Sequence, residues 1–205
     1  DRLGSEFRIL AWTNQAVDDW NRICRNHDLG ADAPPFVVGE RLITRAPIWD
    51  FDDISEPGAS PICANGTELE ILEATQTQVR FSPGVEAQPC WELVASSDSL
   101  LQPITFYALD QQDVPDYQKA LEAWKAEAIS SSGVHGKRIW RTLYYPALRL
   151  WGHLAGPCYA TTVHRAQGGQ WDSVLVDLGD VDRARRSSGS DHQRLLYTAV
   201  TRAQR

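Results

Sequence analysis

Both ends of the chain alternate short apolar runs with helix-type segments, and this alternation restricts the fold more than any other feature. Residues 7–13 form a β-rich run, and Asn14 is predicted to cap a helix over residues 15–26. The same pattern returns late in the chain, with strand, turn, strand and helix segments at residues 157–160, 162–167, 173–178 and 192–202. We therefore predict an α/β fold: a parallel sheet with helices on both of its faces.

The middle of the chain has a different texture, with short β-type runs separated by Pro, Gly and Asn turns. These runs are residues 36–44, 67–74, 78–81, 91–95 and 104–108. Five short strands in this space indicate a small β-barrel. We predict that the barrel, residues 36–109, is inserted into a discontinuous α/β domain formed by residues 1–35 and 110–205.

Two further helices are predicted in the second part of that domain, over residues 116–131 and 138–151, with Pro146 as a kink or boundary. The tryptophans divide into two groups. Trp12, Trp20 and Trp171 fall on core-facing runs, whereas the roles of Trp49, Trp140 and Trp151 stay open.

Composition excludes several classes of protein. The four cysteines are far apart, so neither a metal site nor a disulfide framework is indicated. No apolar run is long enough to span a membrane and no signal peptide is recognisable, so we expect a soluble, cytoplasmic protein with no membrane partner. The net charge of −7 argues weakly against nucleic acid, although residues 135–141 and 183–186 are locally basic.

The chain lacks a phosphate-binding P-loop, which needs a glycine, four residues and then Gly-Lys-Ser/Thr. Its only Gly-Lys pair is Gly136 and Lys137, with Ser131 in place of the first glycine and Arg138 in place of the hydroxyl residue. We therefore expect this polypeptide to be part of a larger motor, or one share of a composite nucleotide site.

A glycine pair at Gly168 and Gly169 is the first candidate for a nucleotide contact. We expect the turn that contains it at the carboxyl ends of the strands, where α/β sheets bind ligands. Glycine lets the backbone approach phosphate or ribose closely, and Gln167 and Gln170 supply uncharged hydrogen-bonding groups. A plain connecting loop with a Gly-Gly turn explains the spacing equally well.

Arg202 is the second candidate. It lies at the end of the last predicted helix, with Tyr197, Thr198 and Thr201. An arginine on a rigid helix can neutralise charge that develops on a transferred γ-phosphoryl group, as an arginine finger does. Taken alone, such a residue is more often a surface or salt-bridging arginine.

Three segments together resemble the C-terminal motifs of superfamily 1 helicases. They are TVHRAQG at residues 162–168, LYTAVTRA at 196–203 and ILAWTNQAVDDWN at 9–21. The first two are most similar to the RecD-like branch, which moves 5′ to 3′. The resemblance implies a second RecA-like motor domain that carries an inserted Src-homology-3-like barrel.

The resemblance also implies roles for single residues. Arg202 would be the catalytic arginine finger, and the ATP-binding contacts would come from Gly168, Gln170 and Gln167. The DNA-binding contacts would come from Thr162, His164 and Asn14. Relatives usually have glutamate where Gln170 stands.

The implied cofactor is ATP with Mg²⁺, bound mainly by an N-terminal RecA-like domain, so this chain alone should not hydrolyse ATP. The implied partners are single-stranded DNA, that N-terminal domain, and nuclease or helicase subunits of an exodeoxyribonuclease V-type repair complex. Two other functions remain open: a non-catalytic nucleic-acid or partner-binding module with vestigial motor motifs, and the helicase half of a conjugative relaxase.

Overall fold

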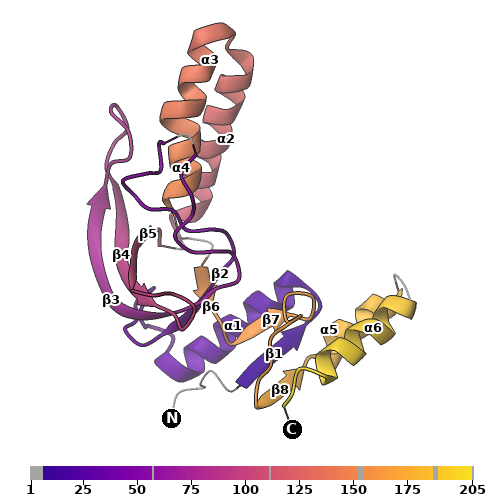
Figure 1. Ribbon diagram of the computed structural model, residues 1–205. Helices are drawn as coiled ribbons and strands as arrows, with labels where there is room; N and C mark the ends of the chain where they lie inside the picture. Colours follow the sequence, from indigo (N-terminus) through magenta and orange to yellow (C-terminus); the bar gives the residue numbers. More distant parts are fainter. Residues whose placement is uncertain (1–6, 57, 111, 152–154, 187–188, 205) are drawn as a thin grey trace. The chain divides into compact units, whose positions relative to one another are not determined.

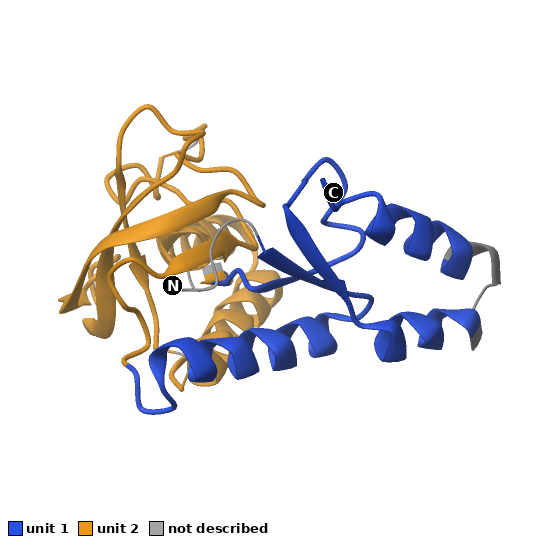
Figure 2. Ribbon diagram, turned by 90° about the horizontal axis from the view of Figure 1, so that it is seen from below, with its two compact units in different colours: residues 1–33, 157–205 blue, residues 34–156 orange. Residues whose placement is uncertain are grey.

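The computed structural model describes residues 7–56, 58–110, 112–151, 155–186 and 189–204 (Figure 1). The chain forms two compact units, which Figure 2 shows in different colours. Unit 1 contains residues 1–33 and 157–205, and unit 2 contains residues 34–156. Each unit is described by itself below.

Unit 1 contains a three-stranded parallel sheet. Its central strand is β1 (Phe7–Ala11), which lies between β7 (Ala160–Thr162) and β8 (Ser173–Val176). Ile9 of β1 is in register with Ala160 on one side and with Leu175 on the other. The predicted parallel arrangement is confirmed.

Helices cover both faces of this sheet. Successive side chains of β1 point to opposite faces, so both faces carry apolar residues that pack against helices. Ile9 and Ala11 pack against Val17 and Cys24 of α1 (Asn14–Leu29). Leu10 faces the opposite side and packs in a cluster formed largely by the C-terminal helices. These helices are α5 (Leu178–Val181), the 3-10 helix η2 (Asp182–Arg186) and α6 (Gly189–Val200). The prediction of helices on both faces is confirmed.

The start of α1 differs from the prediction. Thr13, and not Asn14, is the N-cap: its backbone is extended and its Oγ1 accepts a hydrogen bond from the Ala16 amide at 3.2 Å. Asn14 is the first helical residue and is exposed. Both residue types are good caps. The choice is made by Asp180, which binds the Thr13 backbone and hydroxyl.

Unit 2 contains a five-stranded sheet with the order β5-β4-β3-β2-β6. Its members are β2 (Arg41–Thr44), β3 (Glu68–Val79), β4 (Gln88–Ser96), β5 (Ile104–Ala108) and β6 (Ala155–Pro157). Strands β2 to β5 pair antiparallel in chain order. The prediction of a closed barrel is wrong, because the described strands of unit 2 form a single five-stranded sheet that does not close.

Strand β3 is one long strand where the sequence predicted two runs. Its ladder with β4 continues from Glu70 to Val79, with a register shift between Ile71 and Glu73. The irregularity is a local change of register, which bends a strand without ending it. The run predicted over residues 36–44 is shorter, because only residues 41–44 form a strand.

Unit 2 also contains a helical arm, which Figure 1 shows as α2 packed along the following helices. The arm comprises α2 (Val114–Ser130), α3 (Gly133–Ile139), the π-helix η1 (Trp140–Tyr144) and α4 (Tyr145–Leu150). Tyr117, Leu150 and Trp151 pack with Phe81 of the sheet region in one core. Residues 110–156 thus belong to the compact unit of the sheet. The assignment of motor and insertion to these segments stays a prediction.

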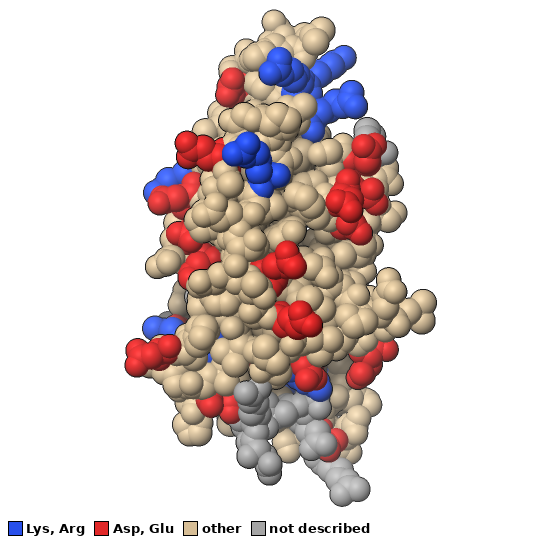
Figure 3. Space-filling model, turned by 90° about the vertical axis from the view of Figure 1, so that its left-hand side faces the viewer, with Lys and Arg blue, Asp and Glu red and all other residues tan. Residues whose placement is uncertain are grey.

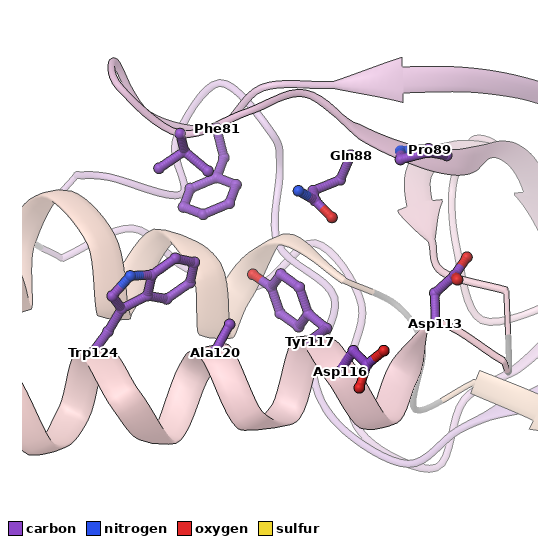
Figure 4. A pocket seen from close by; sticks show the side chains of 9 residues that line it. Phe81, Gln88, Pro89, Asp113, Asp116, Tyr117, Ala120 and Trp124 are labelled. Carbon is purple, nitrogen blue, oxygen red and sulfur yellow. The ribbon is translucent and has the colours of Figure 1, made fainter.

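A cavity of about 270 Å³ lies between α2 and the connection of β3 to β4 (Figure 4). Phe81, Tyr117 and Trp124 line it, and Phe81 and Trp124 meet edge to face at 5.9 Å. Burial raises the pKa of the Tyr117 hydroxyl, which donates to the Ala147 carbonyl. These aromatic side chains therefore pack in the hydrophobic core of unit 2.

Within the described ranges, no helix is long and apolar enough to cross a membrane. The same part of the chain contains no group of three or more His, Cys, Asp or Glu side chains that could hold a metal ion. All four cysteines are buried free thiols.

Candidate functional site

Arg202 lies directly beyond α6, and its guanidinium group reaches the glycine pair. Its Nε donates to the Thr198 carbonyl at 3.2 Å, which anchors the side chain to the last turn of the helix. One terminal nitrogen donates to the Gly169 carbonyl at 3.4 Å, and the other to Thr201 Oγ1 at 3.1 Å. The structure therefore brings together Arg202 and the glycine pair, which are 33 residues apart in sequence.

The backbone around Arg202 is also fixed. The Trp171 amide donates to the Arg202 carbonyl at 3.0 Å, and the Gln204 amide donates back to the Trp171 carbonyl at 2.9 Å. Trp171 and Ala203 thereby form a parallel bridge. This pairing fixes the position of the C-terminal segment relative to the glycine turn.

The Trp171 ring explains why a glycine is needed at position 169. A Cβ on Gly169 would lie 2.6 Å from Trp171 Cη2, closer than van der Waals contact allows. On the sequence alone Trp171 was only a packing residue. The Arg8 guanidinium, on a side chain that is 1% exposed, lies 5.1 Å from the centre of this ring. Gly168 is required for another reason, since its φ of +90° is unfavourable for any other residue.

The glycine pair does not lie where the sequence predicted. The turn begins at the carboxyl end of β7, but Trp171, which packs on Gly169, comes two residues before β8. Its ring contacts Arg8, near the start of β1. The glycine pair and Arg202 thus lie toward the amino ends of the strands. The reason is topological: a connection between parallel strands must return along the sheet before the next strand begins.

Two carboxylates organise the opposite, carboxyl edge of the sheet. Asp180 is 3% exposed and accepts hydrogen bonds from the amides of Trp12 and Thr13 at 2.8 and 2.7 Å and from Thr13 Oγ1 at 2.9 Å. Asp177 accepts from Trp20 Nε1 at 2.8 Å and from the Asp180 amide at 3.0 Å. Sequence analysis missed both residues, because neither belongs to a recognised motif.

The predicted DNA contacts start from this carboxyl edge. Asn14 is exposed at the first residue of α1, and His164 is exposed in the turn after β7. Thr162 is 8% exposed, and its Oγ1 accepts from the Arg165 amide at 3.3 Å. Asn14 and Arg202 are therefore at different ends of the strands.

The remaining nucleotide candidates, Gln167 and Gln170, are exposed on either side of the glycine pair. Arg202 is half-buried, and within the described part of the chain its hydrogen bonds are to neutral oxygens and none is to a carboxylate. Among the described residues, its positive charge is thus oriented by hydrogen bonds and not paired with a carboxylate. Such a group can bind an anion at the exposed side of the glycine turn.

Residues 157–205 match a protein family described as the UvrD-like helicase C-terminal domain. The chain is also 27% identical over 210 residues to the ATP-dependent DNA helicase dda of Enterobacteria phage T4. That alignment covers 96% of this chain and 45% of the phage protein, so the chain spans less than half the length of this relative. The C-terminal segment is therefore similar to a helicase C-terminal domain, and the chain is a distant relative of a superfamily 1 helicase.

Proposed function

We propose that this chain is the C-terminal motor portion of an ATP-dependent DNA helicase of superfamily 1, and that Arg202 is its arginine finger. The observation that carries the proposal is the position of the Arg202 guanidinium, 3.4 Å from the Gly169 carbonyl and bonded to neutral oxygens. This arrangement lies inside the segment that matches the helicase family.

The residues present fit one side of an ATP site and not the whole of it. Arg202 supplies a permanently charged guanidinium group with several N–H donors, and Gln167 and Gln170 supply exposed amide groups. The sequence from residue 157 to 171 contains no Asp or Glu that could hold Mg²⁺. The P-loop and the Mg²⁺ ligands would therefore come from an N-terminal RecA-like domain.

In this proposal the role of Arg202 is electrostatic. ATP supplies the free energy for movement when its γ-phosphoryl group is hydrolysed. Arg202 stabilises the negative charge that develops on that group, because its hydrogen bonds to Thr198 and Thr201 hold the guanidinium in place beforehand. Gly168 has no atom within 4 Å of where a Cβ would stand, so a phosphate can approach the backbone there, whereas Gly169 makes room for the Trp171 ring.

The same proposal assigns a DNA contact to the carboxyl edge. His164 and Asn14 are exposed there and can donate hydrogen bonds to a single-strand backbone, and Thr162 positions the turn through its bond to Arg165. Movement of 5′ to 3′ polarity, and membership of an exodeoxyribonuclease V-type complex, rest on the motif resemblance alone. The phage relative is an ATP-dependent DNA helicase, which supports the helicase class and not these details.

The test is Arg202→Ala in the full-length protein. We expect DNA-stimulated ATP turnover to fall by about a thousand-fold or more, the usual size of an arginine-finger effect, with the affinity for single-stranded DNA kept. Arg22→Ala is the matched control, because Arg22 is an exposed arginine of the same unit, 2.7 Å from Asp19. Its turnover should equal that of the wild type.

If Arg202→Ala retains turnover, this role for Arg202 is wrong. If the wild-type full-length protein binds DNA but hydrolyses no ATP, the motor assignment itself is wrong. In that case a binding module with vestigial motifs would be the better description.

A further inference from the structure

The second half of the helical arm carries aromatic and basic side chains at helical spacing on a face that is not buried. The positions follow an i, i+3, i+4, i+7, i+8 pattern, which places them on one side of a helix. They are Lys137, Trp140, Arg141, Tyr144 and Tyr145, and we refer to them as the arm patch. Lys137, Arg141 and Tyr145 are exposed, and Trp140 and Tyr144 are half-buried.

The core of unit 2 uses the other side of the same helices. Gly136, Ile139, Pro146, Ala147 and Leu150 are buried there. An ordinary amphipathic helix would place polar residues on the face away from this core. The arm patch instead places three aromatic rings there, and none of them belongs to the two hydrophobic clusters described for unit 2.

A π-helical turn groups the three rings. The Tyr145 amide donates to the Trp140 carbonyl, five residues back, and Pro146 has no amide to continue the normal pattern. The wider turn brings both tyrosines next to Trp140, whose ring centre is 4.6 Å from that of Tyr144 and 5.5 Å from that of Tyr145. Single π-helical turns within α-helices occur frequently at functional sites.

The arm patch is basic in a chain that is acidic. The chain carries 27 Asp and Glu and a net charge of −7, but residues 128–171 contain no acidic residue at all. Figure 3 shows Lys and Arg side chains gathered near the end of the helical arm, with Asp and Glu dominating most of the same face below it. An anionic partner would therefore be attracted to this part of unit 2.

The far end of α4 limits the patch. Arg149 stacks on Trp49 at 4.3 Å and donates to the carbonyls of Ile54 and Glu56. The segment that it binds, residues 50–56, contains four acidic residues. This end would repel an anion, so a binding surface reaches from Lys137 to Tyr145 and no further.

We infer that the arm patch binds single-stranded nucleic acid, at a site separate from the one around Arg202. Cations spaced along a helix suit backbone phosphates, and half-exposed aromatic rings suit the faces of unpaired bases. Base pairing hides those faces, and for this reason the surface favours a single strand over a duplex. The site lies outside the segment that matches the helicase family and does not depend on the role of Arg202.

The first test measures the salt dependence of binding by the full-length protein to a fluorescein-labelled oligothymidylate, using anisotropy. Lys137→Gln with Arg141→Gln should weaken binding at low salt. It should also reduce the slope of log affinity against log salt by about one to one and a half, since a contacted phosphate of a single strand contributes about 0.7.

The matched control removes the same charge from the other helix of the arm. Lys119→Gln with Lys125→Gln takes two lysines from α2, where they pair with Asp116 at 2.7 Å and with Glu122 at 3.4 Å. Its salt slope should equal that of the wild type. Equal slopes for the control and for the arm-patch variant would overturn the proposal.

The second test addresses stacking. Tyr145 is 45% exposed, so Tyr145→Ser should fold, and we expect affinity to fall by about five-fold or more, whereas Tyr145→Phe should bind as the wild type does. In addition, an oligonucleotide with 5-iodouracil should crosslink to residues 137–145. Unchanged affinity in Tyr145→Ser, or crosslinks found only elsewhere, would overturn the proposal, as would equal competition by duplex DNA.

ATP turnover reports separately on Arg202, so the failure of one proposal is distinguishable from the failure of the other.

Discussion

At the scale of single residues, Asp180 connects three parts of unit 1. It is almost fully buried and accepts two backbone amides and one hydroxyl from Trp12 and Thr13, and thereby fixes the turn between β1 and α1. We expect Asp180→Asn to lower the free energy of unfolding by about 2–4 kcal/mol. The amide keeps one acceptor and places an N–H group against another donor. Urea denaturation followed by circular dichroism measures the change.

Asp19→Asn is the control for this variant. Asp19 is 44% exposed in its side chain and pairs with Arg22 on the surface of α1. Its removal should change the free energy of unfolding by about 0.5 kcal/mol or less, as for other exposed ion pairs. Similar losses in the two variants would show that Asp180 does not hold the turn.

At the scale of elements, the buried side of β4 makes unit 2 sensitive to alkaline pH. Burial, followed by the negative charge of Glu92, raises the pKa of the Cys90 thiol from 9.0 to about 11. The unfolded chain therefore loses this proton at lower pH than the folded chain does. The stability that Cys90 contributes is fully present below pH 9 and is lost as the pH rises toward about 11.

Cys90→Ala should reduce this loss. We expect its free energy of unfolding to fall less steeply than that of the wild type between pH 9 and about 11, as measured by urea denaturation at several pH values in this range. A slope remains, because burial also raises the pKa values of Cys63, Tyr107 and Tyr117. Identical slopes in the two proteins would contradict the burial of a neutral thiol at this position.

At the scale of the whole molecule, each unit has hydrophobic cores of its own. Among the described residues, the two clusters of unit 2 contain members from residues 36–151 only, and those of unit 1 contain members from its own two segments only. We therefore expect residues 34–156, expressed alone, to fold and to unfold in one cooperative transition in urea. Circular dichroism and tryptophan fluorescence should give the same midpoint.

The shorter fragment 36–109 tests whether the compact unit ends at residue 156 or at residue 109, as predicted from the sequence. It lacks Tyr117, Ala147, Leu150 and Trp151, which pack on Val79 and Phe81 in one cluster. We expect the shorter fragment to lose cooperative unfolding or to unfold at much lower urea. Equal stability of the two fragments would support the insertion predicted from the sequence, residues 36–109.

The sequence by itself determined those features that depend on neighbouring residues. Alternation of apolar residues predicted the strands and helices at both ends of the chain. The TVHRAQG and LYTAVTRA segments predicted that Gly168 and Arg202 act together, and in the structure the Arg202 guanidinium donates to the Gly169 carbonyl at 3.4 Å. Local periodicity and turn chemistry depend on residues that are close together in the sequence, so they can be recognised without knowing the fold.

The tertiary structure alone decided the features that depend on distant contacts. Asp180, 167 residues away, makes Thr13 the cap in place of Asn14. The Trp171–Ala203 bridge places Arg202 beside the glycine pair, and the packing of Trp151 and Tyr117 places the helical arm with the sheet of unit 2. Pairing of distant strands likewise produced one sheet of five strands where short runs had indicated a barrel. Such contacts join positions that are far apart in the sequence. The residues next to one position do not indicate its partner, so no local pattern could have predicted these contacts.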